Sequence, residues 1–149
     1  LRTPTDDVTV EVGREIGRKL GEILVNYRKI AGIGRGLAAP QIGIAKSVFV
    51  TYLDDKLQTY INPKIVVQSD EKNYYRELCL SSGIMWADVE RSETITMEWL
   101  DESEETHSQE VNGFMARLFQ HEESHLRGRP NLDDAVPGTI EVTTRDPLK

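Results

Sequence analysis

Two histidines four residues apart carry the clearest chemical signal in the sequence. His121 and His125 enclose Glu122 in the run His-Glu-Glu-Ser-His. On a helix this spacing places both imidazoles on one face, about one turn apart, where both can reach one cation. Glu122 follows the first histidine and is placed to take a proton from water rather than to bind the metal. The pattern predicts a catalytic site for a divalent metal ion.

A catalytic site of this kind usually has three protein ligands and one open position, so a third ligand must come from elsewhere. Cys79, the single cysteine, is the best chemical candidate because thiolate binds Zn(II) and Fe(II) strongly. A buried and inert thiol is the competing interpretation. We expect His107 to be solvated in a polar hairpin. The remaining downstream alternatives are the amide of Asn131, a poor ligand, and the carboxylates of Asp133, Asp134 and Glu141.

Two shorter segments add groups that a hydrolytic site could use. The run from Gly34 to Gln41 reads Gly-Arg-Gly-Leu-Ala-Ala-Pro-Gln. Its glycines let a ligand's backbone come close, and the amide of Gln41 offers N–H donors. The run Glu77-Leu78-Cys79-Leu80-Ser81 places the thiol in a short apolar stretch that an acid precedes.

Taken together and in this order, these three segments resemble the signature motifs of the peptide deformylases. The family's patterns are G-apolar-G-apolar-A-A-x-Q, E-G-C-L-S and H-E-x-x-H. Leu1-Arg2 with Val8, and Ile61-Asn62-Pro63, are similar to two further family segments, so the resemblance covers roughly residues 1 to 130. It implies hydrolysis of the N-formyl group from the formyl-methionyl residue of nascent peptides, with release of formate.

The resemblance also implies a role for each matching residue. Cys79, His121 and His125 would hold one divalent metal per chain, natively Fe(II), with Zn(II), Ni(II) or Co(II) as possible occupants. Glu122 would be general base and then general acid. The side-chain amide of Gln41 and the backbone N–H of Leu80 would stabilise the oxyanion. Glu77 would pair with Arg91, 14 residues on. The expected substrate-binding residues are Gly34, Arg35, Gly36, Glu77, Leu78, Phe114, Arg117 and Leu118.

Three of these residues depart from the family pattern. Leu78 replaces a glycine, and Arg35 and Arg117 replace apolar residues, all near the expected position of the substrate's first residue. We expect both arginines to point outward, with only their stems lining the pocket. Our hypothesis is a milder preference for methionine, or tolerance of polar or acidic first residues.

The elements that must position these residues can be read from hydrophobic spacing. A helix is expected over residues 7–29, capped by Thr5, Asp6 or Asp7, and a second over 113–126, ended by Gly128. Strands are expected at 47–53, 57–61, 64–68, 93–100 and around 139–143, with Asn62-Pro63 as a break and the acidic run 101–105 as a hairpin turn. The fold class is α+β: mostly antiparallel sheets packed around a central metal-binding helix, with an N-terminal helix.

Composition limits the alternatives. A length of 149 residues suits a single catalytic domain, 1–149, and a net charge of −7 argues against nucleic-acid binding. No apolar run is long enough for a membrane span, and one unpaired cysteine suits a reducing compartment, the cytoplasm or an organelle matrix. The tail after Gly128 lacks the long helix that some relatives dock on the ribosome, so we expect no such contact. A zinc endopeptidase with a downstream third ligand and a non-catalytic metal-binding relative remain open.

Overall fold

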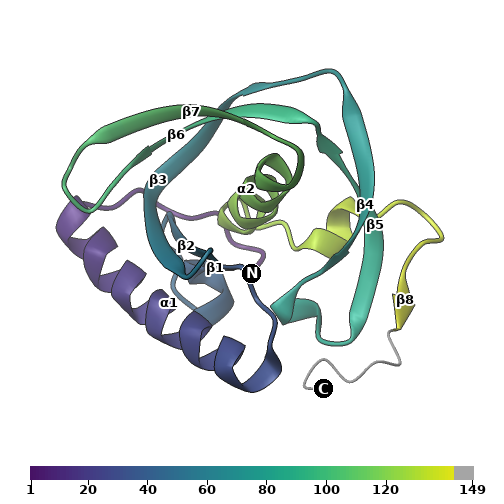
Figure 1. The fold of residues 1–149 in the computed structure, drawn as a ribbon, viewed down its shortest axis with the longest axis horizontal. Coiled ribbons are helices and arrows are strands. Elements are labelled where there is room, and N and C mark those ends of the chain that lie inside the picture. The colour runs from purple at the N-terminus through teal and green to yellow at the C-terminus, as the bar shows by residue number, and fades with distance from the viewer. Residues whose placement is uncertain (143–149) are drawn as a thin grey trace.

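Two antiparallel sheets surround a central helix, as Figure 1 shows for the computed structural model, which describes residues 1–142. The larger sheet has the strand order β1-β2-β3-β6-β7 and the smaller one β4-β5-β8. The predicted α+β class is confirmed. The helices are α1 (Val10–Ala31) and α2 (Gly113–Leu126), and the strands are β1 (Gly36–Ala38), β2 (Val48–Leu53), β3 (Lys56–Gln68), β4 (Lys72–Leu78), β5 (Met85–Ser92), β6 (Thr94–Leu100), β7 (Thr106–Asn112) and β8 (Glu141–Val142).

The N-terminal helix α1 begins at Val10, three residues later than predicted. Thr9 is the cap, because its hydroxyl accepts a hydrogen bond from the N–H of Val12 at 3.4 Å. The predicted caps were wrong: Asp6, for example, forms an isolated bridge with Lys46. Glycines of α1 face β3, and a Cβ at Gly17 would lie 2.4 Å from a side-chain atom of Thr59. These glycines let the helix lie close against the sheet.

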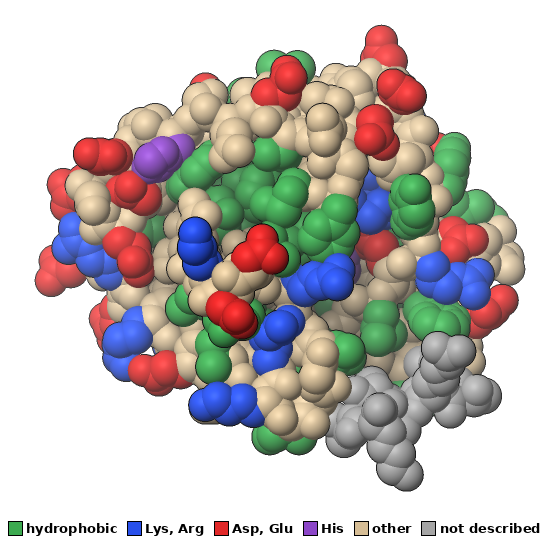
Figure 2. Space-filling view, viewed as in Figure 1, with side chains coloured by type: hydrophobic (Ala, Val, Ile, Leu, Met, Phe, Trp, Pro, Cys, Tyr) green, Lys and Arg blue, Asp and Glu red, His purple; other side chains and the backbone are tan. Residues whose placement is uncertain are grey.

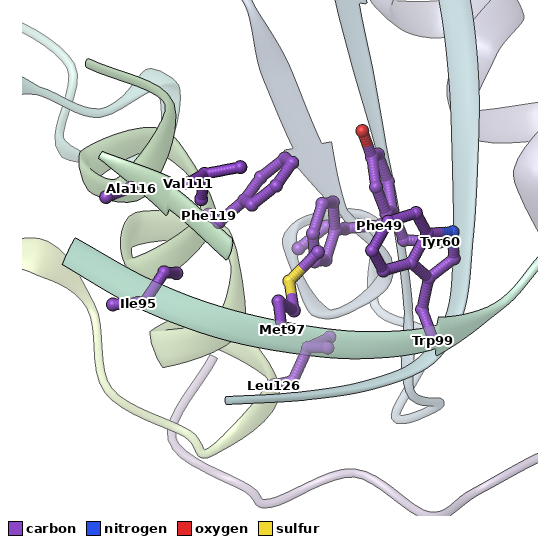
Figure 3. Close-up of a cluster of buried hydrophobic side chains, with 10 residues drawn as sticks. Phe49, Tyr60, Ile95, Met97, Trp99, Val111, Ala116, Phe119 and Leu126 are labelled. Carbon is purple, nitrogen blue, oxygen red and sulfur yellow. The ribbon is translucent and has the colours of Figure 1, made fainter. Parts of the chain in front are cut away.

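The central helix α2 has the bounds that the sequence predicts. Its buried face meets the larger sheet, where the ring of Phe119 lies 5.1 Å from Tyr60 and 6.1 Å from Phe49 (Figure 3). This packing anchors α2 between the two sheets. The cluster comprises Ala38, Phe49, Tyr60, Ile95, Met97, Trp99, Val111, Ala116, Phe119 and Leu126.

Strand β3 runs through Asn62-Pro63, where the sequence predicts a break. Asn62 adopts a φ of 48°, and the strand register shifts between Ile61 and Lys64, so the irregularity is absorbed as a bulge. The side chain of Asn62 accepts from the N–H of Val8 at 2.9 Å and donates to its carbonyl at 2.8 Å. The prediction of two separate strands was therefore wrong.

The smaller sheet is the part of the fold that the sequence missed. Strands β4 and β5 pair over their full length, yet most side chains of β4 are exposed or partly exposed, so no apolar alternation marks it.

The expected hairpin between β6 and β7 is confirmed, with the acidic run at its turn. Strand β8 falls within the predicted 139–143, of which residue 143 lies outside the described residues. Neither described helix is long and apolar enough to cross a membrane.

Candidate metal centre and substrate cleft

The fold brings the thiol of Cys79 against the two histidines of α2. Cys79 follows β4 directly, and its Sγ lies 3.3 Å from Nε2 of His125. One ligand atom from each of Cys79, His121 and His125 lies within 4.8 Å of the others. Cys79 is 2% exposed and His125 fully buried. A thiolate and two imidazoles arranged in this way form a donor set that suits one divalent transition metal.

Hydrogen bonds around the three side chains orient them for metal binding. Nδ1 of His121 donates to Oε2 of Glu77 at 2.9 Å, which leaves Nε2 of His121 free to face the thiol. The sulfur of Cys79 accepts from the N–H of Ser81 at 3.4 Å and faces Nε2 of Gln41 at 3.6 Å. The thiolate is the form of cysteine that binds a metal.

The carboxylate and histidine candidates for the third ligand are engaged elsewhere within residues 1–142. Asp133 pairs with Arg2 at 2.7 Å, and Asp134 lies 2.5 Å from Arg129. His107 was expected to be solvated but is only partly exposed, because Nε2 lies 2.7 Å from a carboxylate oxygen of Asp101 and its ring stacks on a tryptophan. None of them joins His121 and His125 in a ligand group of the described residues.

Glu77 connects the metal-binding helix to the smaller sheet. Arg91, predicted as its partner, donates Nε and Nη2 to the two carboxylate oxygens at 3.1 and 3.0 Å. Burial by itself would raise the pKa of Glu77, but the hydrogen bonds from His121 and Arg91 outweigh it and lower the pKa to about 2. The carboxylate is therefore ionised at neutral pH and holds the ring of His121 in place.

Arg117 does not point outward as the sequence suggested. It is 8% exposed, and Nη1 donates to Oε1 of Glu77 at 2.6 Å and to the carbonyl of Val89 at 3.1 Å. Nη2 donates to the backbone carbonyl and the side-chain oxygen of Asn73. The buried carboxylate of Glu77 and the carbonyls of Val89 and Asn73 draw the guanidinium inward. Arg35, in contrast, is exposed, with its guanidinium carbon 4.8 Å from the ring centroid of Phe114.

Glu122 lies in a pocket that a glycine shapes. It is 3% exposed, and a Cβ placed on Gly36 would lie 2.3 Å from Oε1 of Glu122, so only glycine leaves room for this carboxylate. Burial raises the pKa of Glu122 to about 7.

Burial also lowers the pKa of His125 to about 3. It would lower that of His121 too, but hydrogen bonds with Cys79 and Glu77 raise the latter to about 10. Without a cation the cluster therefore holds a proton on His121, which metal binding must displace.

The amide of Gln41 is oriented by the segment that contains it. Its Oε1 accepts from the N–H of Ala38 at 2.8 Å, so the NH₂ group is turned the other way, toward Cys79 and the hydroxyl of Ser81. Leu80, whose backbone N–H is the second predicted donor, opens the short helical turn Leu80–Ser82 directly after Cys79.

These groups share one cleft of about 730 Å³ between β1, β4 and α2. All eight residues predicted to bind substrate line it, together with Gln41, Cys79, Leu80, His121 and Glu122, while Arg91 and His125 lie behind its wall. The lining residues that the sequence did not suggest include three from β4, the strand that went unrecognised. The unpredicted lining residues are Arg28, Gly32, Ile33, Asn73, Tyr75, Arg76, Glu93 and Gly113.

Comparison with known proteins agrees with this geometry. The family model described as Polypeptide deformylase matches residues 1–139. The peptide deformylase of Pseudothermotoga lettingae is 43% identical over 116 residues, which cover 77% of this chain and 66% of that protein. The peptide deformylase of Rhizobium meliloti is 41% identical over 133 residues, covering 86% and 73%. The chain thus spans about two thirds of the length of the first of these relatives.

Solved structures of the same family share the fold. The peptide deformylase of Thermotoga maritima superposes with a TM-score of 0.80 at 31% identity, covering 91% of this chain and 90% of that one. The enzyme of Synechococcus elongatus, solved in complex with actinonin, has a TM-score of 0.80 at 32% identity, covering 93% and 74%. This chain belongs to the peptide deformylase family, whose members remove the N-formyl group from nascent peptides.

Proposed function

We propose that this chain is a metal-dependent peptide deformylase. It hydrolyses the N-formyl group of the formyl-methionyl residue of nascent peptides and releases formate, with residues 1–149 as a single catalytic domain. The observation that carries the proposal is the approach of three ligand atoms to within 4.8 Å of one another, in a cleft that Glu122 and Gln41 also line. A site that only stored metal would need neither of the last two side chains.

The donor set supports one divalent cation, natively Fe(II), with Zn(II), Ni(II) or Co(II) able to take its place. Cys79, His121 and His125 would hold it, because soft thiolate and borderline imidazole ligands suit these ions better than Mg²⁺ or Ca²⁺. When bound, such a cation supplies a Lewis acid for the formyl oxygen and makes water nucleophilic near neutral pH. A formamide is an unactivated amide, so its hydrolysis needs both contributions.

Glu122 would move the proton. As a carboxylate it accepts a proton from the attacking water, and as an acid it returns that proton to the leaving amine. A pKa of about 7 suits both directions, since neither form is strongly disfavoured at neutral pH. The close contact with Gly36 holds the carboxylate in the cleft.

Gln41 and Leu80 would stabilise the oxyanion that forms on the formyl carbon. The hydrogen bond from Ala38 fixes the orientation of the Gln41 amide before substrate arrives. A donor of this kind contributes about 3 kcal/mol to lowering the barrier when its position is fixed in advance.

The peptide would bind as an extended strand between two sheet edges. β1 and β4 are the end strands of their sheets, and residues of both line the cleft. Their free backbone groups can pair with a peptide main chain whatever its sequence. The side chain of the first residue then lies against α2, next to Leu118 and the stem of Arg117, a residue whose charge faces Glu77 instead.

Formate release by iron-loaded protein tests the proposal. Cys79→Ser should lose most of its metal and its activity, whereas Glu122→Gln should keep the metal and lose activity. Ser108→Ala, an exposed residue of β7, is the matched control and should retain both. A zinc endopeptidase with a downstream ligand would instead keep its metal in Cys79→Ser, and a non-catalytic relative would release no formate at all.

The partners and location follow from the same proposal. N-formylated nascent peptides would be the binding partners, and a thiol that must stay reduced to bind the metal would suit the cytoplasm or an organelle matrix. The expectation about ribosome contact concerns the tail after Gly128, of which residues 143–149 lie outside the described residues.

A further inference from the structure

Arg35 presents an unneutralised positive charge at the mouth of the cleft. The cleft has four arginines, of which Arg76 pairs with Asp88 and Glu141, and Arg117 pairs with Glu77. Within residues 1–142, Arg35 and Arg28 have no ion-pair partner. Arg28 donates to the carbonyl of Gly34 at 2.5 Å and lies over the ring of Tyr52. Tyr52 is not among the residues that line the cleft, whereas Phe114 is, so Arg35 is the unpaired arginine that lies on an aromatic ring of the cleft lining.

The carboxylates that line the cleft contact residues other than Arg35. Glu77 accepts hydrogen bonds from two arginines and His121, and Glu93 accepts one from the side-chain amide of Asn73. Glu122 lies deep in the cleft against Gly36. Within residues 1–142, none of these carboxylates pairs with the Arg35 guanidinium beside Phe114, and the net charge of the whole chain is −7. Figure 2 shows basic, acidic and hydrophobic side chains side by side over the middle of one face.

The spacing along α2 places Arg35 where the first side chain of a substrate ends. Arg117 lies one turn before His121, and Phe114 lies about 10 Å before His121 along the helix axis. A formyl group at the metal centre puts the following side chain along this face of α2. We expect the end of a side chain as long as that of glutamate or methionine to reach Phe114 and the guanidinium of Arg35, whose carbon lies 4.8 Å from the centroid of that ring.

We propose that Arg35 is a specificity-determining residue that favours a carboxylate over a neutral side chain of equal length at the first residue of an N-formyl peptide. The guanidinium donates two hydrogen bonds to the carboxylate, and Phe114 holds the guanidinium flat against the cleft wall. The inference rests on the proposed function, because the metal centre locates the first residue. Arg117 takes no part, since Glu77 already neutralises it.

The test compares two peptides of nearly equal shape that differ in charge. We expect kcat/KM for formyl-Glu-Ala amide to exceed that for formyl-Gln-Ala amide by about fivefold, which is the upper value for an exposed ion pair. The difference should lie in KM and shrink as salt is added. Formyl-Met-Ala amide reports the basal activity. The peptides are amides, so a terminal carboxylate cannot supply the effect.

Variants of single arginines show which arginine causes the preference for the Glu peptide. The Glu-to-Gln ratio should fall to about 1 in Arg35→Gln and below 1 in Arg35→Glu. Arg18→Gln makes the same change of charge on the exposed face of α1, where Arg18 pairs with Glu22, and should leave the ratio unchanged. A ratio of 1 or less in the unmodified protein overturns the inference, and so does a ratio that persists in Arg35→Gln or disappears only in Arg28→Gln.

Failure of the proposed function gives a different result. If no formyl peptide releases formate, the function is refuted, and equilibrium binding of the same two peptides to the metal-loaded protein still measures the preference. Equal dissociation constants then overturn the role of Arg35, whereas tighter binding of the Glu peptide that depends on Arg35 supports it.

Discussion

Replacing Gly36 with alanine should displace the proposed general base without disturbing the metal. The new Cβ would lie 2.3 Å from Oε1, 2.6 Å from Cδ and 2.9 Å from Cγ of Glu122, whereas ordinary contact begins at 3.4 Å. The carboxylate must therefore retreat by about 1 Å. A misplacement of this size costs about 100-fold in rate when the group transfers a proton in the transition state.

The assay is formate release by metal-loaded protein, with metal content measured on the same sample. We expect Gly36→Ala to lower kcat about 100-fold while the bound metal stays at one per chain, since Gly36 makes none of the contacts that orient Cys79, His121 or His125. Gly36 has an ordinary φ, so alanine fits the backbone. The cost of the crowded contact should be about 1–3 kcal/mol of stability, which leaves the fold intact.

A double-mutant cycle separates displacement of the base from general damage. In a Glu122→Gln background, where no base remains, Gly36→Ala should have little further effect. An equal loss of kcat in both backgrounds would refute the reasoning, and so would loss of metal in the single variant.

Three further predictions concern pH and packing. A general base acts when it is deprotonated, so kcat/KM should rise with pH and level off near pH 7, the pKa of Glu122. The positive charge of a bound cation would move the start of this plateau to a lower pH. A kcat/KM that still rises above about pH 8 would contradict the assignment. In metal-free protein, the lowered pKa of Glu77 contributes about 3 kcal/mol of stability that is present above about pH 4.5 and lost as the pH falls to about 2. Denaturant titrations should thus give a shallower acid dependence for Glu77→Gln, and equal slopes would argue against this linkage. Gly17→Ala places a Cβ 2.4 Å from Thr59 and should lower the free energy of unfolding by about 1–2 kcal/mol, whereas the exposed Lys19→Ala should change it by less than about 0.5; an unchanged midpoint in Gly17→Ala would show that α1 can move away.

The parts of the fold with a strong local pattern were predictable. The bounds of α2 follow from its apolar spacing and from the glycines at its two ends, and the acidic turn marks the β6–β7 hairpin. The β4–β5 hairpin has no such pattern, because most side chains of β4 are exposed or partly exposed and two of the buried positions of β5 are the polar residues Arg91 and Ser92. The bulge at Asn62 was mistaken for a break, since nothing local shows that Val8, far away in the sequence, satisfies its side chain.

The sequence by itself determined the chemistry that this protein carries: two imidazoles one turn apart, a glutamate between them, a lone thiol, and motifs that resemble those of one family. These are properties of residue types and short spacings, which do not depend on distant contacts. Only the tertiary structure decided that the thiol reaches His125, 46 residues away, and that Gly36 makes room for Glu122. It also decided which arginine has an ion-pair partner, because Glu77 draws Arg117 inward whereas Arg35 lies exposed at the mouth. Neutralisation of a charge depends on what packs against it, and long-range packing cannot be read from neighbouring residues.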